Sequence, residues 1–102
     1  MAEQRGSNRR NGSGNRRLSA REAVELVRSD FPALLGRPIE AVLGVERADE
    51  NGWQVTVQVV ELRRIPQTTD VLGAYAVVLD KNGELVEYRR RRRYTRSQAD
   101  ED

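Results

Sequence analysis

The sequence predicts an α+β fold, in which one amphipathic helix packs on a four-stranded antiparallel sheet. A capped helical pattern occupies residues 19–35, and alternating strand patterns fill most of residues 39–94. The connections between those strands are short, and short connections join antiparallel neighbours. The chain of 102 residues is long enough for one domain with a modest core. We place this domain at residues 18–96.

The helix is predicted to begin after Ser19, because Ser19 and Glu22 have the spacing of a capping box. Pro32 disfavours helical geometry at the residue before it. We therefore expect the helix to kink or end near Asp30, with one further turn allowed up to Gly36. The apolar residues that recur at helical spacing on one face are Ala20, Ala23, Val24, Val27, Phe31, Leu34 and Leu35.

Residues 39–62 are typical of a β-hairpin. Asn51-Gly52 favours a two-residue turn, because both residues tolerate a positive φ. Trp53 is in phase with the valines that follow it, which favours core packing over a role as a partner anchor. The residues expected to share one face of each strand are Ile39, Ala41, Leu43 and Val45 in the first, and Trp53, Val55, Val57 and Val59 in the second.

Residues 63–70, "RRIPQTTD", predict a loop, and two further strands follow it. The first has Tyr75, Val77 and Leu79 on one face. After a tight turn in "DKNGEL", the last strand ends in a run of arginines that is too charged to be covered on either face. A simple pairing of these two strands places Tyr75 near Tyr88, and Asp70 near Arg93.

Charge is divided unevenly along the chain. Residues 1–17 carry +4 and residues 18–88 carry −5, whereas residues 89–96 carry +6 and residues 97–102 carry −3. The first 17 residues are almost devoid of apolar side chains, so we expect a disordered basic arm. The last six residues read as an acidic tail.

Several functional classes are excluded by composition. The chain has no cysteine and no histidine, which removes disulfides, thiolate sites, the usual zinc ligands and the usual general base. No apolar run approaches the ~20 residues that a membrane span needs, and there is no secretory signal pattern. We expect a cytoplasmic protein without cofactor or metal that is not an enzyme.

The arginine run, Arg89–Arg93, has three interpretations. Dense positive charge between two tyrosines suits a nucleic acid. The arginines also suit a solvated strand end that pairs with acidic groups of the domain. Arginine and tyrosine are, in addition, enriched at protein interfaces.

A set of residues then points to a family. The matching positions are Trp53, Val57, Val60, Glu61, Arg64-Ile65-Pro66, Asp70-Val71-Leu72, Tyr75, Val77, Leu79-Asp80, Gly83, Leu85, Tyr88, Arg90, Arg93-Tyr94 and Arg96. In this order and spacing, residues 53–96 resemble the gas vesicle protein O family, GvpO. The arginine run is denser than the family pattern requires, which leaves room for an added electrostatic role. The helix-then-strands order is also similar to the small PepSY type of domain, an analogy of fold alone.

The resemblance implies an accessory protein needed for the formation of gas vesicles, the gas-filled protein shells that give cells buoyancy. It implies no enzymatic activity, and it implies other gas vesicle proteins as partners, including shell proteins, accessory proteins and the vesicle ATPase. The alternative is a nucleic-acid-binding regulator that uses both basic segments. A free edge strand also leaves the oligomeric state open.

The hypothetical partner surface combines the loop at residues 63–70 with the end of the last strand. The arginines of the loop would supply charge-assisted contacts, Pro66 would stiffen it, and Asp70 would anchor arginines. The residues assigned to this surface are Arg63, Arg64, Pro66, Asp70, Tyr88, Arg90, Arg93, Tyr94 and Arg96.

Overall fold

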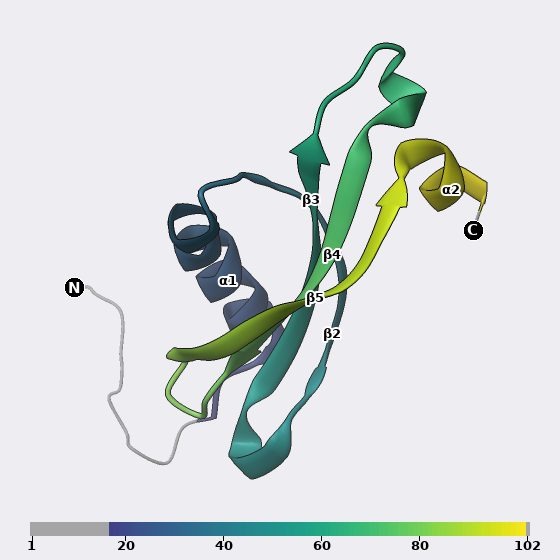
Figure 1. The fold of residues 1–102 in the computed structure, drawn as a ribbon. Helices are drawn as coiled ribbons and strands as arrows, with labels where there is room; N and C mark the ends of the chain where they lie inside the picture. Colours follow the sequence, from purple (N-terminus) through teal and green to yellow (C-terminus); the bar gives the residue numbers. More distant parts are fainter. Residues whose placement is uncertain (1–16, 102) are drawn as a thin grey trace.

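The computed structural model describes residues 17–101, and it confirms the predicted α+β fold. Helix α1 lies on one face of a four-stranded antiparallel sheet whose strand order is β2-β3-β4-β5 (Figure 1). The predicted basic arm, apart from its last residue, lies outside the described residues. The elements are α1 (Ala20–Leu35), β2 (Ile39–Arg47), η1 (Asp49–Asn51), β3 (Trp53–Leu62), η2 (Gln67–Thr69), β4 (Val71–Leu79), β5 (Leu85–Thr95) and α2 (Arg96–Glu101).

Helix α1 has the predicted capping box. The Ser19 hydroxyl accepts from the Glu22 amide at 3.1 Å, and the Glu22 carboxylate accepts from the Ser19 amide at 2.8 Å. The helix does not end near Asp30; it runs through Pro32 to Leu35, which is the further turn that the sequence allowed up to Gly36. Pro32 lies in the last turn of α1, where it removes one intrahelical backbone donor. Gly36 then ends the helix at φ 80°, in the left-handed region that glycine tolerates.

The core lies between α1 and the sheet. Three buried residues of the helix, Ala23, Val27 and Phe31, pack against the alternating residues of β3 and β4. Trp53 is part of this core, and its indole N–H donates to the carbonyl of Leu18 at 3.1 Å. The sheet residues of the core are Trp53, Val55, Val57, Val59, Tyr75, Val77 and Leu79, which confirms both predicted stripes.

Strand β2 departs from the predicted alternation. Its pairing with β3 shifts between Ile39 and Ala41, and again between Val42 and Gly44. Ile39 and Val42 pack against the core, whereas Leu43 is exposed. The prediction of one shared face for alternate residues is therefore wrong, because each bulge moves the following residues to the other face.

The turn between β2 and β3 also differs from the prediction. Positive φ occurs at Glu50 (58°) and Asn51 (66°), not at the pair Asn51-Gly52. Ala48 and Gly52 close a longer loop, in which the Ala48 amide donates to the Gly52 carbonyl at 3.0 Å. Gly52 is needed for another reason: a Cβ there would lie 2.3 Å from the carbonyl oxygen of Leu79.

Strand β5 pairs with β4 through two bulges, which leave Val86 and Arg91 without a partner in the register. Tyr75 is opposite Arg90, although the rings of Tyr75 and Tyr88 are still neighbours at 6.3 Å. The prediction that places Asp70 near Arg93 is wrong. The bulges bring Arg96 there instead, and its backbone amide donates to the Asp70 carbonyl at 3.0 Å.

The bulge at Arg91 also creates a second, smaller cluster on the face of the sheet away from α1. Tyr94 is buried there against Leu72, Ala74 and the partly buried Val60. The expectation that the end of this strand is uncovered on both faces is thus wrong for Tyr94.

The short helix α2 (Arg96–Glu101) was not predicted; its residues fell at the domain boundary and in the acidic tail. Thr95 precedes it, and the Thr95 amide donates to the Gln98 side chain at 2.8 Å. This is one half of a capping box, and the spacing of Thr95 and Gln98 is its sequence signal.

Candidate functional site

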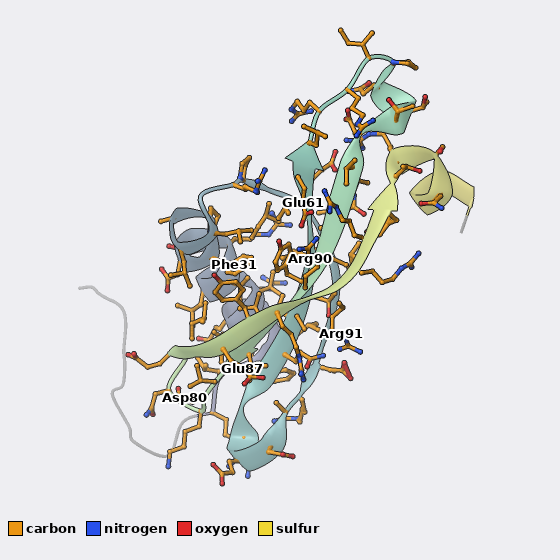
Figure 2. The ribbon with its side chains drawn as sticks, in the orientation of Figure 1. Phe31, Glu61, Asp80, Glu87, Arg90 and Arg91 are labelled. Carbon is orange, nitrogen blue, oxygen red and sulfur yellow. The ribbon has the colours of Figure 1, made fainter. Side chains whose placement is uncertain are left out.

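A nearly buried carboxylate organises the arginines on the α1 face of the sheet. The side chain of Glu61 is only 9% exposed. Its Oε2 accepts a hydrogen bond from the Tyr75 hydroxyl at 2.7 Å, and its Oε1 lies 3.3 Å from a nitrogen of Arg90 and 3.3 Å from Nε of Arg93. Figure 2 shows Glu61 and Arg90 close together between α1 and the sheet. We call Glu61, Tyr75, Arg90 and Arg93 the Glu61 cluster.

The sequence places Glu61 there by strand periodicity. Glu61 continues the stripe of Val55, Val57 and Val59, so its side chain points to the α1 face at the end of the apolar core. Gly73 on β4 provides the space, because a Cβ at this position would lie 2.3 Å from Oε2 of Glu61. Arg37, just after α1, closes the cluster from the helix side by donating to the Glu61 carbonyl at 2.8 Å.

The Glu61 cluster favours the protonated form of its tyrosine. Burial raises the pKa of the Tyr75 hydroxyl, and the hydrogen bond to the Glu61 carboxylate raises it further. Tyr75 therefore stays a hydrogen-bond donor at neutral pH. Both arginines pair with Oε1 of Glu61, and their side chains remain 44% (Arg90) and 57% (Arg93) exposed. The cluster thus fixes two cations at the surface.

A second carboxylate holds the loop between β3 and β4. Asp70 is 1% exposed, and its Oδ1 accepts from the Arg64 backbone amide at 2.7 Å. Its Oδ2 lies 3.1 Å from Arg96 and 3.9 Å from Arg63. The Arg64 amide, and after it Arg96, lower the pKa of this carboxyl against the opposing effect of burial. We call Asp70, Arg63, Arg64 and Arg96 the Asp70 cluster.

A chain of polar contacts extends from the Asp70 cluster across the face away from α1. Arg96 also pairs with Glu40 of β2 at 2.9 Å, and Glu40 accepts from the Gln58 side chain at 3.2 Å. The Tyr94 hydroxyl in turn donates to Gln58 at 2.5 Å. The guanidinium of Arg92 lies over the Tyr94 ring, 4.7 Å from its centroid. These contacts connect β2, β3 and the end of β5.

The structure divides the predicted surface residues into three groups. Tyr88, Arg90 and Arg93 lie on the α1 face, where Tyr88 packs edge-on against Phe31 at 5.1 Å between ring centroids. The exposed loop residues are Arg63, Arg64 and Pro66, and the supporting residues, mostly buried within the domain, are Asp70, Tyr94 and Arg96.

Sequence reasoning assigned no role in the site to Glu61, Gly73, Glu40 or Gln58. A signal existed for Glu61, because a carboxylate in phase with a buried valine stripe needs a partner. No sequence signal pointed to Glu40 or Gln58, since their contacts depend on the register between β2 and β3.

Two further properties were searched for across the described part of the chain. No helix within residues 17–101 is long and apolar enough to cross a membrane. Within the same residues, no three carboxylates gather where they could hold a metal ion.

Comparison with known proteins places the chain in a family. The family model described as "Gas vesicle synthesis protein GvpO" matches residues 6–100. A gas vesicle protein O of Streptomyces sp. (strain CB03234) is 48% identical over 67 residues, which are 66% of this chain and 52% of the relative. A gas vesicle protein O of Haloferax mediterranei is 32% identical over 92 residues, covering 89% and 60%.

A third relative, gas vesicle protein O1 of Halobacterium salinarum, is 34% identical over 88 residues, covering 86% of this chain and 67% of the relative. The chain thus spans little more than half the length of the first two relatives. No solved structure matches it. With the family model matching nearly the whole chain, the chain belongs to the gas vesicle protein O family.

Proposed function

We propose that this protein is a non-enzymatic accessory factor of gas vesicle formation, which acts in the cytoplasm through contacts with other gas vesicle proteins. The family match over residues 6–100 carries the proposal. It is supported by the Glu61 cluster, which holds Arg90 and Arg93 in place while leaving about half of each side chain exposed. Cations that are already ordered lose less side-chain entropy when they bind.

The proposed contact surface runs from the loop at residues 63–70 along the α1 face of β5. Its exposed members are Arg63, Arg64, Pro66, Tyr88, Arg90 and Arg93. The Asp70 cluster supports the surface from within, because it joins the loop to the end of β5. Arginines around a partly exposed tyrosine are typical of the binding surfaces of proteins.

Affinity capture tests the proposal. The tagged protein is isolated from vesicle-producing cells, with and without nuclease, and the retained gas vesicle proteins are quantified. The variant Arg90→Ala/Arg93→Ala should retain roughly 5- to 30-fold less partner, as expected for the loss of two charged contacts. The matched control is Arg21→Ala/Arg28→Ala, which removes the same charge from exposed positions of α1.

Thermal unfolding of both variants shows that each is folded. Equal retention by the two double variants contradicts the proposed surface. If gas vesicle proteins are lost on nuclease treatment and nucleic acid is recovered without nuclease, the protein is instead a nucleic-acid-binding regulator. In that case binding should weaken steeply with salt, because phosphate contacts release counterions.

A further inference from the structure

The loop between β3 and β4 displays one apolar side chain completely to solvent. Ile65 is 99% exposed. Figure 1 shows this loop projecting beyond the ends of the neighbouring strands, at the top of the view. A fully exposed isoleucine at a projecting tip makes no apolar contact within the domain. It is therefore available to another molecule.

The loop is held rigidly from below. Directly before Ile65, the Arg64 amide donates to the Asp70 carboxylate at 2.7 Å. On the other side, the carbonyl of Pro66 accepts from the Thr69 hydroxyl at 2.7 Å and from the Thr69 amide at 2.9 Å. The two residues that flank Ile65 in the chain, Arg64 and Pro66, thus both take part in hydrogen bonds within the loop region. An apolar group displayed on a fixed backbone is pre-organised for binding.

The charge beside Ile65 restricts the kind of pocket that this loop can bind. Arg63 and Arg64 precede Ile65, and both side chains are exposed. Asp70 is buried beneath them, where it pairs with Arg96 at 3.1 Å and more distantly with Arg63 at 3.9 Å, while the Arg63 side chain stays 69% exposed. The tip therefore offers an isoleucine beside two cations, and its complement is an apolar pocket with carboxylates at its rim.

We propose that Ile65 is the anchor of this protein on another gas vesicle protein, where it enters an apolar pocket rimmed by acidic side chains. The inference rests on the proposed function, and it specifies the chemistry of the partner. Ile65 would supply the buried apolar contact, and Arg63 and Arg64 would pair with the rim.

A second copy of this chain is the competing occupant that the crosslinking test below must distinguish, because its pocket beside Val78, Leu79 and Val86 carries the carboxylates Asp49, Glu50 and Asp80. Its apolar groove between α1 and β2 is lined by Ala20, Val24 and Val45, but Arg21 and Arg28 stand beside Glu25 at the rim. Two arginines there would repel the basic tip. A lipid surface does not fit, because stable anchoring needs more apolar area than one isoleucine offers.

Site-specific photocrosslinking tests the inference in vesicle-producing cells. A benzophenone amino acid replaces Ile65 in one variant and Val86 in another; Val86 is also an exposed aliphatic residue, but it lies on β5. We expect residue 65 to crosslink a gas vesicle protein at an apolar segment bordered by aspartate or glutamate, and residue 86 not to do so. A crosslink from residue 65 to a second copy, to lipid or to nucleic acid overturns the inference.

The substitution Ile65→Ala then measures the contribution of the anchor. Retention of the crosslinked gas vesicle protein should fall roughly 10- to 50-fold, as expected for losing three buried carbons. Val86→Ala is the matched control and should change nothing. If the wild type and Ile65→Ala retain the gas vesicle protein equally, this inference alone is overturned. If the wild type retains no gas vesicle protein, the proposed function fails, and the inference fails with it.

Discussion

Replacing Glu61 with alanine should destabilise the protein through a single buried acceptor. The substitution leaves the hydroxyl of the buried Tyr75 without its partner at 2.7 Å. An unsatisfied buried donor costs about 1–3 kcal/mol. The lost pairs with Arg90 and Arg93, which are partly exposed, add about 0.2–1 kcal/mol each. We therefore expect the free energy of unfolding to fall by about 2–4 kcal/mol.

The assay is urea unfolding followed by tryptophan fluorescence, because Trp53 is the only tryptophan and lies in the core. In thermal unfolding of a domain of this size, the same change lowers Tm by roughly 8–30 °C. Glu61→Gln is the matched control. It retains an acceptor for Tyr75 and loses only the charge, so it should cost about half as much as Glu61→Ala.

A double-mutant cycle with Tyr75→Phe isolates the hydrogen bond. If the bond contributes as argued, Glu61→Ala and Tyr75→Phe should couple by about 1–2 kcal/mol, because the second substitution removes the donor that the first leaves unsatisfied. Additivity within about 0.5 kcal/mol would refute the reasoning. It would mean that the Tyr75 hydroxyl finds water as readily as it finds Glu61.

Two further predictions concern the residues around these carboxylates. Gly73→Ala should destabilise by about 1–3 kcal/mol, as overpacking does, because its Cβ would lie 2.3 Å from Oε2 of Glu61. In the Glu61→Ala background the same substitution should cost less, with only the contact to Tyr75 at 3.0 Å remaining. An unchanged cost measured by urea unfolding would contradict this account. Asp70→Asn should make the free energy of unfolding less dependent on pH in the acid range. The pKa of Asp70 is lowered in the folded state, first by the Arg64 amide, so its stabilisation is present at neutral pH and is lost as the pH falls below the ordinary value of 3.8 and through the lowered pKa of the folded state. Unfolding at a series of pH values checks this, and parallel profiles for wild type and Asp70→Asn would count against it.

Periodic patterns predicted most of the fold. The alternation from Trp53 to Val59, and from Tyr75 to Leu79, is enough to identify β3, β4 and the face that α1 covers. The Ser19 capping box likewise marks the start of α1. These features are local, and the residues that cause them are adjacent in the chain.

Register was not predictable in the same way. The bulges in β2 and β5 insert single residues, and their positions depend on packing against the neighbouring strand. Tyr94, for example, packs against Leu72 and Ala74 of β4. A shift of a few residues in the register of β5 is enough for Asp70 to pair with Arg96 and for Arg93 to pair with Glu61. The pairings between these arginines and carboxylates therefore could not be predicted from the sequence.

The bulge at Arg91 bears on the length of the arginine run itself. Tyr88 and Tyr94 are six positions apart in the chain, and in a regular strand such a separation places two side chains on the same face. They lie on opposite faces because Arg91 is unpaired, and Figure 2 shows Arg91 across β5 from Arg90. With four arginines the two tyrosines would be five positions apart, which places them on opposite faces of a regular strand without a bulge. Loss of one arginine from this run is therefore a change that the fold can absorb, with both tyrosines keeping their places.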